Sequence, residues 1–150
     1  MYIKKMFKED CIQYECVITP PELNDNINTV MLKQAQAFLL NKCTSFGFIK
    51  QIFKIKTKSE GIINIEGSII YKVWIDVLVC NPEIGDEIEC EITDKDDRIG
   101  KPIMKKHPLL VVIFSENEHE IGEKLIGTIT DKRIDKTNNM INLLVDIKEN

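Results

Sequence analysis

Alternating side-chain character in residues 69–80, IIYKVWIDVLVC, constrains the fold more than any other feature of this chain. Side chains of a β-strand point to opposite faces with a period of two, so the pattern predicts a long strand with one buried face. The face that we expect to be buried carries Tyr71, Val73, Ile75, Val77 and Val79. Such a strand requires a sheet, and the flanking sequence supplies candidates for the other strands.

One predicted strand and one predicted helix precede it. Residues 11–18, CIQYECVI, place Ile12, Tyr14, Cys16 and Ile18 on one face. In the next four residues, Thr19 stands three before Glu22, with proline between them, which is a capping-box helix start. We expect a helix of about 20 residues that ends near Cys43 and packs on the sheet. Its apolar stripe would consist of Leu23, Ile27, Val30, Met31 and Phe38.

The stretch TSFGFIKQIFKI, residues 44–55, predicts another strand. Its expected apolar face comprises Phe46 and Phe48 and, beyond a short break in phase, Phe53 and Ile55. The expected solvent-exposed face comprises Lys50, Lys54, Lys56 and Lys58. Gly47, between two phenylalanines, indicates a bulge or a close approach of another backbone. Beyond the strand, Gly61 and Gly67 flank a short apolar piece, which predicts a hairpin that projects from the sheet.

The second half of the chain predicts a small barrel. Alternation or apolar runs at residues 88–92, 109–114, 125–129 and 140–147 indicate four or five short strands with no helix. Turns are expected at residues 94–97, 98–102, 116–122 and 135–139. A barrel of this size favours an OB-fold. The predicted class is α+β, with an N-terminal domain of residues 1–82 and an OB-fold barrel of residues 83–150.

Composition narrows the function classes. Residues 1–82 carry ten Lys against eight acids, whereas residues 83–150 carry ten Lys and Arg against sixteen acids. Neither half therefore has the large excess of positive charge with which a protein binds nucleic acid non-selectively. No apolar run approaches a membrane span, and the charged N-terminus does not suit a signal peptide, so we expect an intracellular protein. The five cysteines form no CxxC pair and are expected to be buried reduced thiols.

Sequence motifs of catalysis and cofactor binding are missing. The chain has no phosphate loop, no GxGxxG, no GxSxG and no HExxH. His107 and His119 are expected to be solvated surface histidines. The cluster of Asp94, Asp96 and Asp97 lacks the glycine and glutamate of a calcium loop. We therefore expect no metal, no cofactor and no enzyme activity.

Basic residues gather in two predicted barrel loops. Lys101, Lys105 and Lys106 lie beside His107, and Lys132 and Arg133 lie near the last hairpin. Strand faces and rim loops of OB-folds hold single-stranded nucleic acid by charge and stacking. These lysines and Arg133 are candidate RNA contacts, and the open alternative is a solvated charged rim.

The order of these elements resembles one known family. The segments NKCTSFGFIKQIFKI and EGIINIEGSIIYKVWIDVLVCNPEIGDEIECEI are similar to the stalk subunit of multisubunit RNA polymerases, the family of the seventh-largest subunit of eukaryotic RNA polymerase II and its archaeal counterpart. KKHPLLVVIFS and IGEKLIGTITDKRID extend the resemblance to about 140 of the 150 residues. The chain is shorter than cellular members, and its many Lys, Ile and Asn residues agree with an AT-rich genome. That combination resembles the shortened stalk subunits of large DNA viruses, found in the virion and the host cytoplasm.

The resemblance implies a docking role. In the family, the projecting loop wedges into the polymerase body at the base of its clamp. The residues to which this role would fall are Phe46, Gly47, Phe48, Gly61, Ile62, Ile63, Ile65 and Gly67. Ile69 and Ile70 would add to the exposed apolar surface, flanked by Glu60 and Glu66. The implied partners are the largest core subunits, with a second stalk subunit and nascent RNA left open.

Two other classes stay open. A free-standing OB-fold protein that binds single-stranded RNA or DNA would have appreciable oligonucleotide affinity in isolation, which falls steeply with salt. An enzyme would require a base, a nucleophile or a metal set that the motifs do not supply. The hairpin isoleucines themselves have an alternative interpretation, as core residues of an ordinary hairpin.

Overall fold

The structure, a computed structural model, describes residues 7–147, which divide into two compact units. The N-terminal unit comprises Lys8–Lys42 and Ile49–Val79. The C-terminal unit comprises Phe7, Cys43–Phe48 and residues 80–147. The short segment Cys43–Phe48 thus groups with the second half of the chain, although the boundary expected from the sequence, between residues 82 and 83, assigns it to the first.

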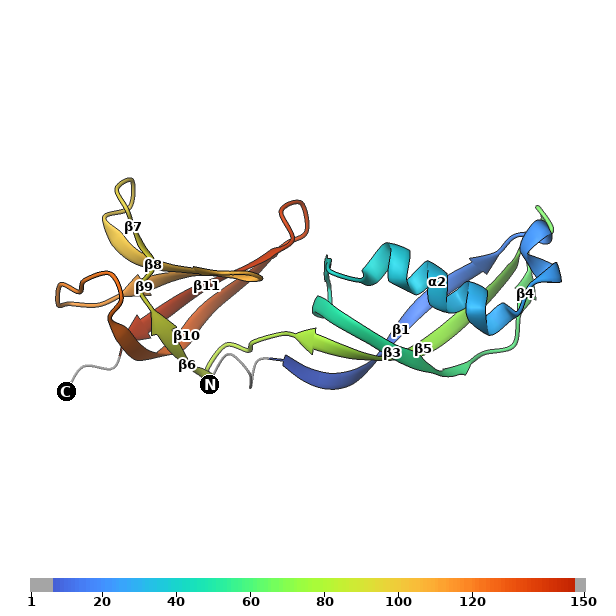
Figure 1. Ribbon diagram of the computed structural model, residues 1–150, viewed down its shortest axis with the longest axis horizontal. Coiled ribbons are helices and arrows are strands. Elements are labelled where there is room, and N and C mark those ends of the chain that lie inside the picture. The colour runs from blue at the N-terminus through green and yellow to red at the C-terminus, as the bar shows by residue number, and fades with distance from the viewer. Residues whose placement is uncertain (1–6, 148–150) are drawn as a thin grey trace. The chain divides into compact units, whose positions relative to one another are not determined.

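An antiparallel sheet and one α-helix make up most of the N-terminal unit (Figure 1). The strand order of the sheet is β1-β5-β3-β2, where β2 belongs to the segment Cys43–Phe48 of the C-terminal unit, and β4 pairs with β5. The strands are β1 (Phe7–Ile18), β2 (Cys43–Thr44), β3 (Gly47–Lys58), β4 (Ile62–Ile63) and β5 (Ile69–Cys80). Val73, Ile75, Val77 and Val79 of β5 are buried, as the alternation predicted. Val30, Met31 and Ala35 of helix α2 (Ile27–Leu39) share a core with them.

The predicted helix of 20 residues is wrong, because it is broken in two. Thr19 and Glu22 form the expected capping box, but it starts only a 3₁₀ helix, η1 (Pro20–Asn24). Asn26 then accepts hydrogen bonds from the backbone N–H groups of residues 28 and 29 and starts α2 as a separate helix. The break changes the phase of the apolar stripe, so Leu23 is exposed. Phe38, near the end of α2, is 61% exposed and does not pack on the sheet.

The predicted faces of β3 also need correction. Phe48 and Ile49 are adjacent and both buried, Phe48 in the core of the C-terminal unit and Ile49 in that of the N-terminal unit. The alternation is interrupted because the strand passes from one core to the other at this point. Ile52 is therefore buried, and Phe53, an expected core residue, is exposed.

A curled sheet of six strands forms the C-terminal unit. The strands are β6 (Glu87–Glu91), β7 (Asp94–Asp96), β8 (Lys101–Lys106), β9 (Leu109–Phe114), β10 (Lys124–Asp135) and β11 (Met140–Ile147). Their order is β6-β10-β11-β9-β8-β7, with β9 and β11 parallel. Ile92 donates its N–H to the carbonyl of Glu123, and Thr93 donates to that of Ile103. Because residues 92 and 93 connect β6 to β7, the two ends of the strand order meet and the sheet curls on itself.

Two expected turns of this half are strands instead. The sequence predicts a turn at residues 94–97 and a loop at 98–106, but β7 and β8 pair there in an antiparallel ladder. Ile103 and Met104 are buried and pair with Val112 and Val111 of β9, which holds β8 in the sheet. The turn shrinks to four residues that end at Gly100, whose φ is +67°.

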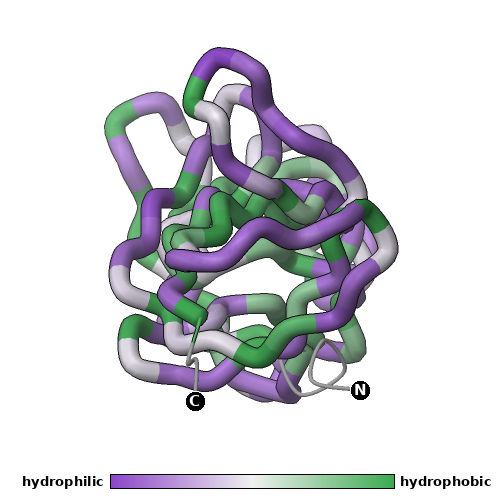
Figure 2. The backbone as a smooth tube through the Cα atoms, turned by 90° about the vertical axis from the view of Figure 1, so that its left-hand side faces the viewer, coloured by the Kyte–Doolittle hydropathy of each residue, from purple (hydrophilic) through white to green (hydrophobic). Residues whose placement is uncertain are grey.

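Hydrophilic and hydrophobic residues alternate along much of the chain, as Figure 2 shows. The class is α+β with two sheets, one of them curled.

Candidate docking and nucleic-acid interfaces

The segment of residues 59–70, here called the tip hairpin, is a tight turn on two short strands. Ile62 and Ile63 of β4 pair with Ile70 and Ile69 of β5. Between the strands, Asn64 Oδ1 accepts hydrogen bonds from the backbone N–H groups of Glu66 and Ser68, each at 3.0 Å. Gly67 has a φ of +81°, a conformation that glycine adopts without steric cost. The turn is therefore held by the Asn64 side chain together with backbone hydrogen bonds between Asn64 and residues 67 and 68.

Three isoleucines of the tip hairpin face solvent. Ile62 is 68% exposed, Ile63 72% and Ile65 105%. The alternative interpretation, in which these residues form a core, is wrong for the chain by itself. Ile69 and Ile70, also expected to be exposed, are half-buried because they belong to the long strand β5.

A shallow pocket of about 610 Å³ adjoins the tip hairpin. Glu15, Glu60, Ile62, Ile70 and Lys72 contribute to its lining. Gly61 also lines it, and a Cβ at this glycine would lie 2.9 Å from the ring of Tyr71. Gly61 is thus required by close packing and Gly67 by its backbone conformation.

Phe46, Gly47 and Phe48, which the resemblance also assigns to docking, do not belong to the tip hairpin. Phe48 is 2% exposed in the core of the C-terminal unit and meets the ring of His107 edge-on at 4.9 Å. Gly47 is buried against the backbone of Cys80. Phe46 is partly exposed beside them. The structure brings together only Gly61, Ile62, Ile63, Ile65 and Gly67 of the predicted docking set.

Three of the five predicted RNA-binding residues lie on one face of the curled sheet, here called the outer face. Residues directly opposite in a ladder share a face. Lys105 pairs with Leu110, Leu110 with Asn142, and Asn142 with Arg133, so Lys105 and Arg133 end one row. Lys101 lies on the same face, with its ammonium 4.5 Å from the centroid of the Phe114 ring. These residues stand on β8 and β10, not in the loops that the sequence predicts.

The other two predicted RNA-binding residues are placed differently. Lys106 pairs with Leu109 and is exposed at the end of β8. Lys132 pairs with the core residue Leu143, and its ammonium donates to Asn81 Oδ1 at 2.7 Å. That ammonium also lies 4.0 Å from a carboxylate oxygen of Glu83. Lys132 therefore has protein partners for its charge.

Acidic side chains stand among the bases of the outer face. Asp146 pairs with Phe114, Asp131 with Leu144 and Asp94 with Ile103, all in outer-face rows. Asp94 lies 3.9 Å from the ammonium of Lys105. Asp96, which pairs with Lys101, belongs to the same face. The acids thus at least match the three bases, so the face has little net attraction for a phosphate backbone.

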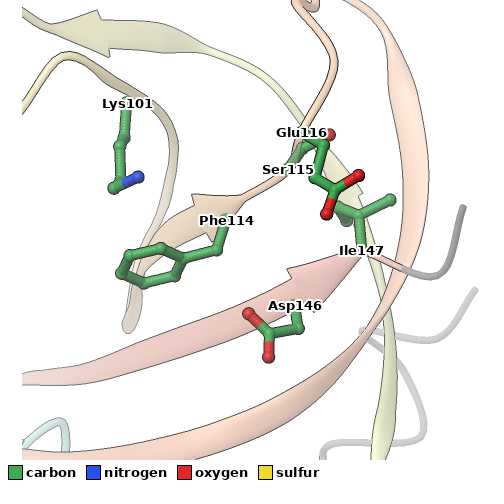
Figure 3. Close-up of a pocket in the computed structure, with 6 residues that line it drawn as sticks. All are labelled: Lys101, Phe114, Ser115, Glu116, Asp146 and Ile147. Atoms are coloured by element: carbon green, nitrogen blue, oxygen red, sulfur yellow. The ribbon is translucent and has the colours of Figure 1, made fainter.

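A pocket of about 490 Å³ opens at the Phe114 end of the outer face (Figure 3). Lys101, Phe114, Ser115, Glu116, Asp146 and Ile147 line it. Figure 3 shows the half-buried Phe114 side chain between Lys101 and Asp146. An aromatic ring with a cation beside it is a stacking platform for a base.

The prediction that His119 is a solvated histidine is wrong. Its side chain is only 11% exposed, because it hydrogen-bonds Ser115 on one side and Glu123 on the other. The spacing of these three residues, four apart and again four apart, is visible in the sequence but matches none of the catalytic motifs considered above. The turn of residues 116–122 is consequently an ordered loop.

Cysteine, histidine and acidic side chains are the residues that could hold a metal ion. Cys16, Cys43, Cys80 and Cys90 are buried, Cys11 is half-buried, and all five are free, as predicted. Within residues 7–147, no three His, Cys, Asp or Glu side chains gather in a way that could hold a metal ion. In the same part of the chain, no helix has the length and hydrophobicity that crossing a membrane requires.

Comparison of the sequence with known proteins does not assign the chain to a family. The chain matches no protein family model and no curated protein sequence.

Proposed function

We propose that the protein is a non-catalytic stalk subunit of a DNA-directed RNA polymerase, which docks on the core enzyme through the tip hairpin. The observation that carries the proposal is the exposure of Ile62, Ile63 and Ile65 on a hairpin whose turn is held by hydrogen bonds to the Asn64 side chain. The family resemblance of the surrounding sequence supplies the identity of the partner, the largest polymerase subunits at the clamp base.

Exposed isoleucines at the end of a hairpin favour burial by a partner. Full transfer of an isoleucine side chain from water into an apolar groove is favourable by about 1.5 to 3 kcal/mol, of which only the part that exceeds the cost of association adds to affinity. Clustered apolar side chains with charged neighbours, here Glu60 and Glu66, are typical of interaction sites. A docked hairpin would shift the clamp equilibrium only through different contacts with its open and closed states.

The proposal includes an OB-fold for the C-terminal unit, and the connectivity of its strands supports that part. An antiparallel barrel with one parallel pair, β9 with β11, and a first strand divided into β6 and β7 suits a small Greek-key barrel. In the proposed assembly this barrel stands near the RNA exit. The balanced charges of its outer face suit weak contact with a transcript that the polymerase already holds nearby.

Affinity purification from the native source tests the proposal. Recovery of the two largest polymerase subunits supports it, and their absence from a purification that recovers the tagged chain overturns it. Ile63→Asp and Ile65→Asp are expected to keep the melting temperature and to lose the polymerase. Ile84→Asp is the matched control, because Ile84 is an exposed isoleucine of the C-terminal unit and its substitution should retain the polymerase. If the tip variants unfold, the isoleucines support the fold and the docking surface is wrong.

A second candidate is a free-standing OB-fold protein that binds single-stranded nucleic acid. The half-buried Phe114 ring, with the ammonium of Lys101 4.5 Å from its centroid, favours it, since an aromatic ring and a cation together suit contact with a base and its phosphate. The two candidates differ in the isolated protein. Submicromolar affinity for oligonucleotides, falling steeply with salt, would favour the second, and weak binding would favour the first.

A further inference from the structure

Ser115, His119 and Glu123 form a hydrogen-bonded chain at the end of β9. Ser115 Oγ lies 2.7 Å from His119 Nε2, and His119 Nδ1 hydrogen-bonds Glu123 Oε2. An ionised carboxylate can only accept, so Nδ1 carries a hydrogen, and in the neutral ring Nε2 then accepts from the serine hydroxyl. The nucleophile, the base and the group that orients the base are therefore in the order that a serine hydrolase uses.

Burial fixes the base while the serine borders open space. The His119 side chain is 11% exposed, and the Glu123 side chain is 44% exposed. Ser115 Oγ also accepts from the backbone N–H of Asn117 at 3.3 Å, which helps to fix the hydroxyl. Ser115 and His119 both line a pocket of about 320 Å³, so a small molecule in it would meet the hydroxyl.

The same pocket contains charges of both signs. Lys95 and Lys101 line it, and so do Glu116 and Glu118. A lysine ammonium near the reacting carbonyl would stabilise the negative charge that develops on oxygen. The volume is at the small end of ligand pockets, so the acyl group must be short.

We propose that Ser115 is an acyl-accepting nucleophile for small carboxylic esters, with His119 as its general base and Glu123 as the residue that positions His119. The hydroxyl proton passes to His119 Nε2 as Oγ bonds to the ester carbonyl carbon. The carbon–oxygen bond to the alcohol breaks, and the alcohol leaves with the proton from His119. Water then hydrolyses the acyl-serine by the same route, releasing the carboxylic acid and restoring the serine. This activity does not depend on the proposed stalk function, in which the chain is non-catalytic only in the sense that it takes no part in the chemistry of RNA synthesis.

An alkyl fluorophosphonate probe tests the nucleophile directly in the full chain. Its reaction forms a bond from Ser115 Oγ to phosphorus and releases fluoride with the hydroxyl proton. Intact mass spectrometry should show one adduct, and peptide mapping should place it on Ser115. Turnover of p-nitrophenyl acetate should be measurable with the same protein.

Variants separate a reactive serine from a loop that is merely well packed. Ser115→Ala should abolish the adduct, and His119→Gln should slow its formation by about 100-fold or more, the usual contribution of a general base. His107→Gln and Ser45→Ala are matched controls and should label at the parent rate. Circular dichroism melting identifies any variant that unfolds, and Glu123→Gln provides a second, conservative test of the chain. An absent adduct, an adduct elsewhere, or equal labelling rates for folded His119→Gln and the parent would overturn the proposal.

Discussion

The carbonyl oxygen of Cys80 occupies the space that a side chain on Gly47 would require. A Cβ at Gly47 would also lie 2.8 Å from Cβ of Asn81, closer than real Cβ contacts. The φ of Gly47 is +118°, outside the range that other residues adopt readily. Steric space and backbone conformation therefore both demand glycine between Phe46 and Phe48, where β3 passes the end of β5 in the C-terminal unit.

Substitution of Gly47 should be among the most destabilising single changes in the chain. Gly47→Ala is expected to lower the free energy of unfolding by about 3 kcal/mol or more, because it adds a backbone clash to conformational strain. Gly85→Ala is the control, since Gly85 has a φ of +98° but open space around it, and it should cost only about 1 to 2 kcal/mol. Urea denaturation of both variants measures the difference. Equal losses would show that strain alone explains Gly47.

The capping box predicts an acid-dependent contribution from Glu22. The hydroxyl and then the backbone N–H of Thr19 donate to its carboxylate and lower the pKa of Glu22. A lowered pKa in the folded state means that this stabilisation is present above the ordinary pKa of 4.5 and is lost as the pH falls through the folded pKa. Carboxyl NMR titration should show the shift, and Thr19→Val should remove most of it. A titration unchanged by Thr19→Val would contradict the capping contact.

The buried cysteines predict a graded response to thiol reagents. Burial, with a smaller effect from the neighbouring Glu89, raises the pKa of Cys90 to about 12. Burial likewise raises the pKa of Cys80 to about 12 and that of Cys16 to about 11. Since the thiolate is the reactive form, Ellman's reagent at pH 8 should modify only the half-buried Cys11 in the folded chain and all five thiols in urea. A Cys11→Ser variant that still reacts rapidly when folded would contradict this burial.

The same thiols predict how stability changes in alkali. Their pKa values are higher in the folded chain than the ordinary value of 9.0. The stabilisation is therefore complete below about pH 9 and is lost as the pH rises towards 12. Thermal melting between pH 8 and pH 11 should show a falling midpoint, and a Cys90→Ala variant should show a shallower fall. If the melting midpoint of the Cys90→Ala variant fell with pH as steeply as that of the parent, groups other than Cys90 would account for the loss of stability in alkali.

The outer face predicts a position-dependent effect on nucleic-acid binding. Lys105→Ala should weaken binding of a single-stranded oligonucleotide and reduce the slope of log affinity against log salt by about 1, because one phosphate contact is lost. Lys106→Ala is the matched control on the neighbouring position of β8, whose paired residue belongs to the opposite face. Fluorescence anisotropy of the isolated protein at two or more salt concentrations measures both. Equal effects of the two variants would show that the outer face is not the binding surface.

Elements that are marked by a local sequence signal could be predicted from the sequence alone. The alternation in residues 69–80 led to β5, the capping box to the start at Thr19, and the solitary Gly47 to a close backbone approach. The tip hairpin also followed from two flanking glycines and an apolar run, whereas the exposure of its isoleucines was expected chiefly from the family resemblance, with a core role as the open alternative. These features depend on neighbours within a few residues, so their physical causes are present in any short window of sequence.

Contacts between distant strands, by contrast, established which residues share a core and which side chains meet. Phe48 and Ile49 are adjacent in sequence but belong to different cores, and no local pattern distinguishes them. The pairing of β8 with β9 turned a charged loop into a strand and brought Lys105 and Arg133 into one row. Burial of His119 likewise depends on how its loop packs at the end of β9. Local propensity differences are smaller than the energy of these long-range pairings, so the tertiary contacts prevailed wherever the two disagreed.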